Sequence, residues 1–324
     1  MNTARDIPGN VSDHSAQPPV CAIVVTFFPD EGLGARIARI AAQCDRVIIV
    51  DNGSDAGVFP LPDRQVEVMR QHSNLGLAAG FNIGLRRAIA LGYAWAMTFD
   101  QDSMPGADMV QRIWTTHEHH PDAAVVGPCI VEQDANKTSY RWLRHHPVLP
   151  GLFQRVGCVD RDRTDVTLLI SSGSMVDLRV WTELGGFDEG LFIDYVDTDY
   201  CLRVLRSGRV LAVSATAELE HRIGARRRAR LLGIGFRPMH HPVLRHYYIA
   251  RNRVRVWRRH ALAVPHWALF DLSFAAHNTL RVLVFEADKV IKLKAFMLGM
   301  WDGLLGRSGS CPERRLRMLR SNTG

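Results

Sequence analysis

Two aspartates stand two residues apart in FDQDSM, residues 99–104, directly after the apolar run YAWAMT. Carboxylates this close repel each other and resist leaving water unless a positive group lies between them. A solvated loop would supply Asp100 and Asp102 with water alone. A divalent cation is the alternative, since Mg²⁺ and Mn²⁺ use one or two carboxylates together with substrate phosphates. The place of the pair after an apolar run leaves the two interpretations evenly balanced.

Asp51 ends a second apolar run, RVIIV (46–50), and is followed by Asn-Gly-Ser. These residue types form turns readily, so a turn is the simpler interpretation. A carboxylate at this place can also accept hydrogen bonds from the edge of a nucleobase. The turn is favoured on local grounds.

The segment NLGLAAGFNIG (74–84) spaces Gly76, Gly80 and Gly84 by four residues. Glycines let a backbone come close to a ligand or to another element of the fold. The spacing is not the G-x-G-x-x-G of a dinucleotide site. A tightly packed helix start and a ligand contact are equally compatible with it.

The stretch FIDYVDTDYCLRVLRSG (192–208) holds Asp194, Asp197 and Asp199. On a helix, the first two would share a face and Asp199 would point elsewhere. Acids in the first turn of a helix complement its dipole. One of them can instead act as a general base that takes a proton from an attacking hydroxyl.

His221 lies in LEHRIG (219–224), just before a basic cluster. A lone histidine is more often structural, but imidazole can complete a Mn²⁺ site that Asp102 begins. The cluster is either a solvated patch or a diphosphate site, because guanidinium groups match phosphate oxygens in pairs. Its members are Arg222, Arg226, Arg227, Arg228 and Arg230.

The elements that position these residues follow from the apolar pattern. Strands are predicted at 21–28, 46–55 and 93–100, helices at 33–42 and 77–91, and a strand, a Gly/Ser turn and a helix at 165–189. Alternating strands and helices predict an α/β fold with a mostly parallel central sheet. Ligands of such sheets bind outside the carboxyl ends of the strands, where Asp51 and Asp100 fall.

The composition is that of a globular protein, with 324 residues, 47% of them hydrophobic and 23% charged. A net charge of +7 suits an anionic partner such as a nucleotide or an acidic membrane face. Six cysteines lie far apart without a CxxC pair, which argues against a zinc site and a disulfide framework and for a reducing compartment.

We expect three segments: a disordered lead-in over 1–19, a catalytic domain over 20–224, and a basic loop with a helical region over 225–324. The lead-in lacks a signal-peptide core, and no run approaches the ~18 apolar residues of a membrane span, so a cytoplasmic protein is expected. Residues 266–301 mix apolar and basic side chains. They predict either a packed helical subdomain or a surface that docks on anionic lipid.

Taken in order, the motifs resemble glycosyltransferase family 2, inverting sugar transferases of the GT-A fold. The match extends from about residue 21 to 224 through VVTFFPD, VIIVDNGS, NLGLAAGFNIGL, TFDQDS, SSGSMVDLRVW, GGFDEGLFIDYVDTDYCLR and LEHRIG. FDQDS, IDYVDTDYCLR, RHYYIARNRV (245–254) and KLKAFMLGMWDGLLGRSG (292–309) further resemble bacterial rhamnosyltransferases of cell-surface polysaccharide assembly. The resemblance implies dTDP-L-rhamnose as the nucleotide-sugar donor.

The resemblance also implies roles for individual residues. Asp197 matches the general base. Many relatives have Glu-Asp where this chain has Val196-Asp197, which makes Asp194 an alternative base. Asp102 would ligate Mg²⁺ or Mn²⁺, with His221 able to join it. The donor-binding residues would be Thr26 and Asp51 at the base and ribose, Asp100 at the ribose or diphosphate, and Asn74, Gly76 and Arg222.

The implied acceptor is a hydroxyl of a polysaccharide precursor on a polyprenyl carrier, which would bring the protein to the inner face of the plasma membrane as a peripheral protein. We expect no nucleic-acid partner, and the sequence leaves a homo-oligomer open. One alternative is transfer of galactofuranose or a hexose from a UDP-sugar. Others are a nucleotidyltransferase, which should carry a basic, glycine-rich loop where FFPDEGLG stands, and a non-catalytic module that binds anionic surfaces.

Overall fold

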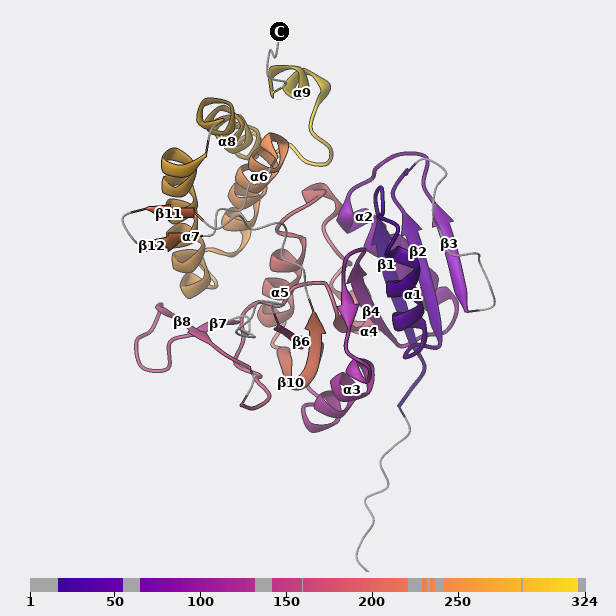
Figure 1. The fold of residues 1–324 in the computed structure, drawn as a ribbon. Helices are drawn as coiled ribbons and strands as arrows, with labels where there is room; N and C mark the ends of the chain where they lie inside the picture. Colours follow the sequence, from indigo (N-terminus) through magenta and orange to yellow (C-terminus); the bar gives the residue numbers. More distant parts are fainter. Residues whose placement is uncertain are drawn as a thin grey trace, which may run out of the picture.

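An eight-stranded sheet lies at the centre of the computed structural model (Figure 1). The structure describes residues 17–54, 65–131, 142–158, 160–220, 229–231, 234–236, 242–286 and 288–319. The strands are β1 (Val20–Thr26), β2 (Arg46–Asp51), β3 (Val66–Arg70), β4 (Trp95–Asp100), β5 (Met104–Pro105), β6 (Ala123–Val131), β7 (Trp142–His145), β8 (Phe153–Val156), β9 (Ser174–Asp177), β10 (Val210–Glu220), β11 (Ala229–Leu231) and β12 (Ile234–Phe236). The helices are α1 (Leu33–Ala41), α2 (Leu77–Ala90), α3 (Met109–His119), α4 (Leu178–Glu183), the 3₁₀ turn η1 (Glu189–Leu191), α5 (Val196–Arg206), α6 (Val243–His260), α7 (Pro265–Phe285), α8 (Lys289–Leu304) and α9 (Glu313–Leu319).

The sheet runs in the order β3-β2-β1-β4-β9-β6-β10-β5. Strands β3, β2, β1 and β4 are mutually parallel, and β9 is antiparallel to both of its neighbours. The first four strands therefore end at one edge, where the turns after β1, β2 and β4 meet. The sequence prediction of a mostly parallel sheet flanked by helices is confirmed.

Strand β1 is buried on both faces, as its unbroken apolar sequence indicates. Cys21, Ile23 and Val25 face the core layer shared with α2 and α5. The alternate residues Val20, Ala22 and Val24 join the opposite layer with α1 and α3. Two hydrophobic layers thus fix the strand ends that carry the polar residues of the site.

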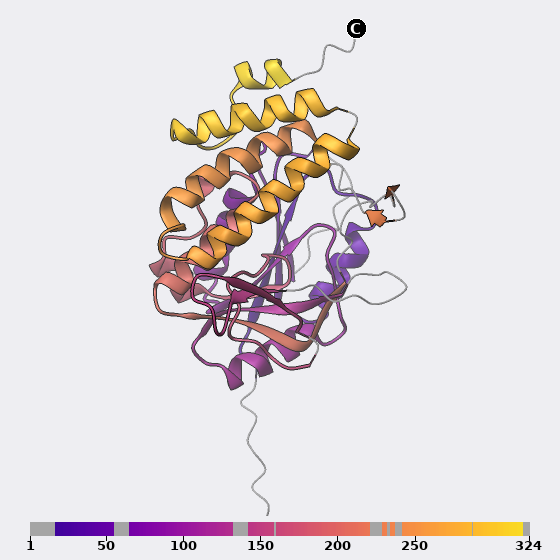
Figure 2. The ribbon, with the colours of Figure 1, turned by 90° about the vertical axis from the view of Figure 1, so that its left-hand side faces the viewer.

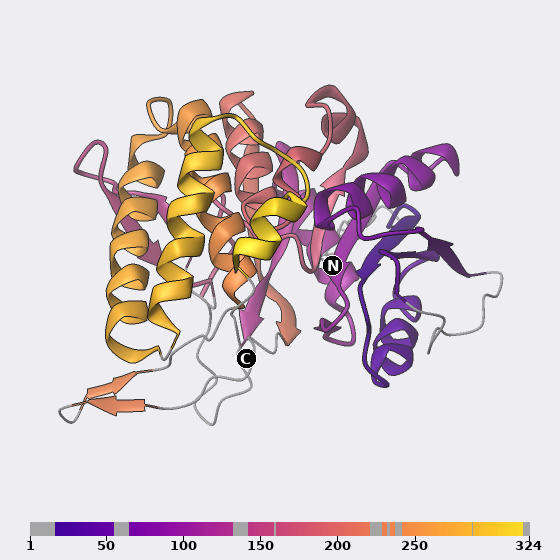
Figure 3. The same cartoon turned by 90° about the horizontal axis from the view of Figure 1, so that it is seen from above.

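The C-terminal helices α6, α7 and α8 form a layer beside α5 and away from β1–β3 (Figures 2 and 3). Helix α8 packs closely on α6 because two glycines face it. A side chain at Gly299 would lie 2.3 Å from the Tyr247 carbonyl oxygen, and one at Gly303 would lie 2.6 Å from that of Arg251. No helix in the described part of the chain is long and apolar enough to cross a membrane.

The predicted strand within 165–172 is wrong, because the chain there is irregular and β9 follows the Gly/Ser turn instead. Gly173 has φ of 75°, a conformation that favours glycine, and its N–H donates to the Thr98 carbonyl at 2.7 Å. The turn therefore reverses the chain before it pairs with β4. Helix α4 follows, as predicted.

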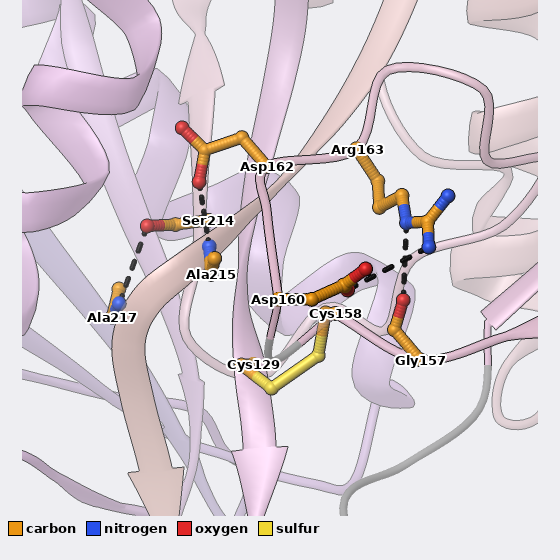
Figure 4. Close-up of a disulfide and its surroundings, with 9 residues drawn as sticks. All are labelled: Cys129, Gly157, Cys158, Asp160, Asp162, Arg163, Ser214, Ala215 and Ala217. Carbon is orange, nitrogen blue, oxygen red and sulfur yellow. Dashed lines mark hydrogen bonds and ion pairs between the residues drawn. A yellow bond between two sulfur atoms is a disulfide. The ribbon is translucent and has the colours of Figure 1, made fainter.

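The sequence argued against a disulfide framework, but the structure has a disulfide between Cys129 of β6 and Cys158 after β8 (Figure 4). Both sulfurs belong to buried residues. In the segment that follows Cys158, Arg163 donates to the Gly157 carbonyl at 3.1 Å, and Asp162 accepts from the Ala215 N–H at 2.7 Å. The bond ties the β7–β8 hairpin to the central sheet. Of the predicted lead-in, residues 1–16 lie outside the described residues.

Candidate active site

A pocket of about 390 Å³ opens at the carboxyl ends of β1 and β4, between the starts of α2 and α5. We call it the rim pocket. Of the residues predicted to act, Thr26, Asn74, Gly76, Asp100, Asp194 and Asp197 line it. The fold thus brings together six side chains or backbone positions that lie up to 171 residues apart in sequence, all at the strand ends where ligands of such sheets bind.

Asp51 lies behind the rim pocket rather than in its wall. Only 1% of the residue is exposed, and its carboxylate accepts hydrogen bonds from Thr26 Oγ1 at 3.2 Å and Ser54 Oγ at 2.6 Å. The bond to Ser54 is the turn interaction expected from Asp-Asn-Gly-Ser. Asp51 therefore holds Thr26 in position at the end of β1.

The glycines of α2 have separate functions. Gly76 precedes the helix with φ of 92°, and a side chain there would lie 2.6 Å from the Phe192 carbonyl oxygen. Asn74 accepts from the Gly76 N–H at 2.9 Å. Gly80 and Gly84 instead face Val25 and Ile23, so they pack α2 against β1. The packing interpretation holds for the last two, while Gly76 lies in the pocket wall.

Asp100 is braced by the Gly/Ser turn at the end of β4. Its N–H donates to Ser172 Oγ at 3.3 Å, and Ser172 Oγ also contacts Ser103 Oγ. Burial, together with the carboxylates of Asp102 and Asp197, raises the pKa of Asp100 to about 7. Arg245 of α6 acts in the opposite direction. Asp102 itself is exposed and lies outside the pocket wall.

The segment before α5 is held in an unusual conformation. Phe192, Asp194 and Tyr195 have φ between 61° and 66°, a region that non-glycine residues rarely occupy. Asn252 of α6 holds this segment, because its Nδ2 lies 2.8, 2.7 and 3.0 Å from the carbonyl oxygens of Leu191, Ile193 and Asp194. Strain of this kind persists only where surrounding contacts enforce it, and it gathers at functional sites.

Asp194 and Asp197 both face the rim pocket, although Asp194 precedes the helix. Arg245 pairs with Asp194, its Nη2 lying 2.9 Å from Oδ1 and its Nε 3.3 Å from Oδ2. Asp197 accepts from the Thr198 N–H at 2.8 Å and from the Ser171 backbone. The pKa of Asp197 is raised to about 6, because burial and the Asp194 carboxylate outweigh the backbone donors, which lower it.

Asp199 is turned away from the pocket, as the helical spacing predicted. It is fully buried and bonded to Arg203 at 2.8 Å, Arg259 at 3.2 Å and His260 at 3.1 Å. Burial would raise its pKa, but these partners outweigh burial and lower the pKa to about 2. The third acid of the motif therefore belongs to the packing of α5 against α6.

Residues 21–179 match the model of glycosyl transferase family 2. The chain is 28% identical to the dTDP-rhamnosyl transferase RfbF of Shigella flexneri, over 90% of this chain and 97% of that protein. The chain carries a glycosyltransferase family 2 domain. It is also 27% identical to the galactofuranosyltransferase GlfT1 of Mycolicibacterium smegmatis, over 66% of this chain and 74% of that protein.

The fold of this glycosyltransferase is GT-A. A crystal structure of GalNAc-T7 with UDP, GalNAc and Mn²⁺ matches 75% of this chain and 48% of that chain, with a TM-score of 0.55 and 13% identity. At that identity the likeness concerns the fold alone. Because the protein is a glycosyltransferase, the two alternative predictions, a nucleotidyltransferase and a non-catalytic binding module, are wrong.

A larger pocket of about 540 Å³ adjoins the rim pocket of the glycosyltransferase. We call it the apolar pocket, because its wall includes many aromatic and aliphatic side chains, among them those of β7, α7 and α8. The two pockets share Asp194, Tyr195, Asp197, Arg245 and Ile170. Asp197 therefore stands where the two spaces meet.

Sequence reasoning missed Arg245 and Asn252 as members of the site. Within the described residues, Arg245 is the one cationic side chain in the wall of the rim pocket, where it faces three carboxylates. Burial acts to lower its pKa, but the Asp194, Asp100 and Asp197 carboxylates raise it. The two missed residues are seven positions apart, so they share a face of α6, and this spacing in RHYYIARNRV was the available signal.

Two predicted residues, His221 and Arg222, lie outside the described residues, as do Arg226, Arg227 and Arg228 of the basic cluster. The described residues contain no group of three or more His, Cys, Asp and Glu side chains placed to hold a metal ion. They do contain two carboxylates close together, those of Asp100 and Asp102. Burial raises the pKa of Asp100, and repulsion by the Asp102 carboxylate is the next cause of that rise.

Proposed function

We propose that this enzyme transfers L-rhamnose from dTDP-L-rhamnose to a hydroxyl of a polysaccharide precursor carried on a polyprenyl lipid. The relative from Shigella flexneri supports this donor, because its match covers 90% of this chain and 97% of that protein. The match to the galactofuranosyltransferase covers 66% of this chain and 74% of that protein. The broader match makes the rhamnosyltransferase the better guide to the donor.

Asp197 is proposed as the general base, and its position between the two pockets is the observation on which this proposal depends. Its carboxylate accepts from backbone N–H groups, so it remains able to take a proton. Asp194 is occupied by the Arg245 guanidinium. A base that is already ion-paired is a weaker proton acceptor, which makes Asp197 the better candidate of the two.

The proposed reaction places the donor in the rim pocket and the acceptor hydroxyl beside Asp197. The hydroxyl oxygen forms a bond to the anomeric carbon as the bond from that carbon to the diphosphate oxygen breaks. The electron pair of the broken bond leaves with the nucleoside diphosphate, and the hydroxyl proton goes to Asp197. Attack opposite the leaving group inverts the anomeric centre. Arg245 faces the growing negative charge from α6 and stabilises it electrostatically.

Asp100 and Asp102 are proposed to hold Mg²⁺ or Mn²⁺, and their chemistry fits such an ion. Both are hard oxygen donors, they repel each other, and Arg245 alone does not balance the carboxylates around it. A bound ion would neutralise the diphosphate as it leaves. Treatment with EDTA should abolish transfer, and Asp102→Asn should raise both the metal concentration for half-maximal rate and the donor KM. Full activity in EDTA would refute the metal proposal.

Peripheral contact with anionic lipid at the inner membrane is proposed from the outer surface of α7 and α8. Several large apolar side chains are exposed there, next to basic ones. They are Leu280, Val290, Met297 and Trp301, with Lys289 and Lys294 on the same helix pair. We expect most of the protein in a membrane fraction that salt or carbonate extracts. Full recovery in the supernatant at low salt would contradict this.

A donor screen tests the proposed function. The protein is incubated separately with dTDP-rhamnose, UDP-galactofuranose, UDP-galactose and GDP-mannose in Mg²⁺, and released nucleoside diphosphate is measured with and without a lipid-linked acceptor fraction. We expect release from dTDP-rhamnose alone. Release from a UDP-sugar alone would instead favour the galactofuranose or hexose alternative.

Two variants assign the base within the same assay. Asp197→Asn should keep donor binding near the wild-type value and lower turnover by about 100- to 10,000-fold, as expected for loss of a general base. Asp194→Asn should retain more activity. If Asp194→Asn abolishes turnover while Asp197→Asn weakens donor binding, the assignment is reversed.

A further inference from the structure

The proposed reaction leaves the apolar pocket unexplained, because a sugar chain does not need it. Its wall includes Trp142, Trp267, Phe270, Phe274, Val282 and Phe296. Saccharide hydroxyls placed against such side chains would lose hydrogen bonds to water without replacing them. Hydrocarbon gains from the same transfer, at roughly 25 cal/mol per Å² of apolar surface removed from water. The wall therefore suits an apolar chain.

The pocket leads from the catalytic carboxylate to the surface of the helical layer. At its inner end it shares Asp197 and Arg245 with the rim pocket. Farther out, Phe274 and Leu283 of α7 and Leu293 of α8 are each more than 40% exposed while still lining the space. Helices α7 and α8 run side by side there, with the β7–β8 hairpin close to α7 (Figures 1 and 3). A long chain can thus lie in the pocket and extend to the outside.

Several polar side chains in the wall are already paired. Asp271 accepts from Arg253 at 2.9 Å and also binds the Tyr195 hydroxyl. Lys292 is paired with the buried Glu286, which lies behind the wall. These side chains have little need of a ligand.

Arg281 of α7 is different. Its Nε is buried without a hydrogen-bond partner, as is Asn278 Oδ1 one turn earlier, and neither side chain is joined by a hydrogen bond or ion pair to another described residue. An unpartnered guanidinium nitrogen inside a protein is costly. An anionic group in the pocket would satisfy it, and phosphate oxygens match guanidinium donors in geometry.

Arg281 also lies on the catalytic side of the pocket. His246, the residue after Arg245, lies within electrostatic reach of the Glu286 carboxylate and of three cationic groups, Lys292, Arg281 and Arg245. Cationic groups therefore continue from Arg245 beside Asp197 to Arg281. An anionic group bound along this line would lie between the catalytic carboxylate and the apolar wall.

We infer that the apolar pocket binds the carrier of the acceptor, with a hydrocarbon chain along α7 and α8 and its phosphate or diphosphate at Arg281. The glycan on the other side of the phosphate then reaches Asp197. The inference rests on the proposed function for the identity of the acceptor, but the pocket binds the carrier whatever sugar the donor supplies. It makes the C-terminal helices part of the substrate site as well as a surface that approaches lipid.

Farnesyl phosphate, below its micelle concentration, is the probe for this pocket, with farnesol and inorganic phosphate as partial probes. Binding is measured by isothermal titration to the full-length protein. We expect farnesyl phosphate to bind more tightly than either partial probe. Arg281→Gln should weaken farnesyl phosphate at least tenfold and leave farnesol unchanged, whereas Phe274→Ser should weaken both.

Leu272→Ser is the matched control, because Leu272 lies on α7, is 54% exposed and does not line the pocket. It should bind farnesyl phosphate like the wild type. Equal weakening by Leu272→Ser and Phe274→Ser would indicate adsorption to the helix surface and would overturn the inference, as would unchanged affinity in Arg281→Gln. Thermal unfolding of each variant verifies folding.

A dTDP titration separates this inference from the proposed function. If dTDP does not bind while the farnesyl phosphate pattern holds, the proposed donor is wrong and the carrier site stands. If the wild type and every variant bind dTDP but none of them binds farnesyl phosphate, the carrier site is wrong and the donor proposal stands.

Discussion

The guanidinium of Arg245 binds the carboxylate of Asp194 through both of its oxygens, at 2.9 and 3.3 Å. The two residues are 51 positions apart, and the contact joins α6 to the strained segment before α5. It has two consequences for the site. First, a cationic group of the C-terminal helices lies beside the carboxylates of the rim pocket. Second, Asp194 is ion-paired, whereas the contacts of Asp197 among the described residues come from backbone donors.

Arg245→Gln should lower kcat strongly while the protein remains folded. Loss of the guanidinium leaves the leaving group without a positive partner from α6, and removal of one such donor typically costs about 100- to 1,000-fold in kcat. Initial rates with dTDP-rhamnose, compared with those of Arg258→Gln on the same helix, measure the effect. Arg258 donates to the Leu304 carbonyl and does not line the rim pocket, so its variant should remain active. Equal rates in the two variants would contradict a role for Arg245.

The pH dependence of kcat/KM should report on Asp197. A general base works when deprotonated, and burial, together with the Asp194 carboxylate, raises the pKa of Asp197 to about 6. Activity should therefore be constant above about pH 7 and fall about tenfold per unit well below pH 6. Initial rates between pH 4.5 and 8, with circular dichroism at each pH to exclude unfolding, give the profile. A profile without an inflection in this range would argue that another group accepts the proton.

The strands that carry the site were predictable because burial on both faces imposes a simple pattern. Continuous apolar runs locate β1, β2 and β4 to within a few residues of their observed bounds. Strand β3 escaped prediction because most of its residues are only partly buried, so its sequence VEVMR has no continuous apolar run. The irregular chain before β9 was misread for the converse reason, since VTLLI is apolar and buries residues without forming a strand.

The acids of the candidate site could be found from motifs, but their partners could not. Asp197 and Asp199 have different partners, because α6 presents Arg259 and His260 to Asp199 and not to Asp197. Contacts between elements this far apart in sequence depend on tertiary packing, which local spacing does not encode. Asp51 shows the same limit, because only the structure reveals that its carboxylate accepts from Thr26 and Ser54.

Asp199→Ala should destabilise the protein strongly without changing the pH profile of the remaining activity. Removal of one partner of a buried ion pair leaves the others buried without a counter-charge, which typically lowers the free energy of unfolding by about 3–5 kcal/mol. Urea unfolding at pH 7 measures the loss. The pKa of Asp199 in the folded protein is lowered to about 2. Its ionised carboxylate therefore stabilises the fold fully above about pH 4, the ordinary pKa of an aspartate, and this stabilisation is lost as the pH falls toward 2. The gap between wild type and variant should therefore narrow in acid; a gap independent of pH would contradict the ion-pair explanation.

The bond between Cys129 and Cys158 should stabilise the protein only under oxidising conditions. It closes a loop between residues 29 positions apart, and a cross-link of that span typically adds about 3 kcal/mol by restricting the unfolded chain. Cys129→Ser with Cys158→Ser should lower the free energy of unfolding by about this amount without reductant, and should unfold like the wild type in dithiothreitol. The matched control is Cys44→Ser, at a buried cysteine that is not bonded to another. Its stability relative to the wild type should respond little to dithiothreitol.

Because the bond anchors the β7–β8 hairpin, which supplies Trp142 to the apolar pocket, reduction should also weaken farnesyl phosphate binding while dTDP binding stays the same. Equal stability of the wild type with and without dithiothreitol would show that the two thiols do not form this bond in solution.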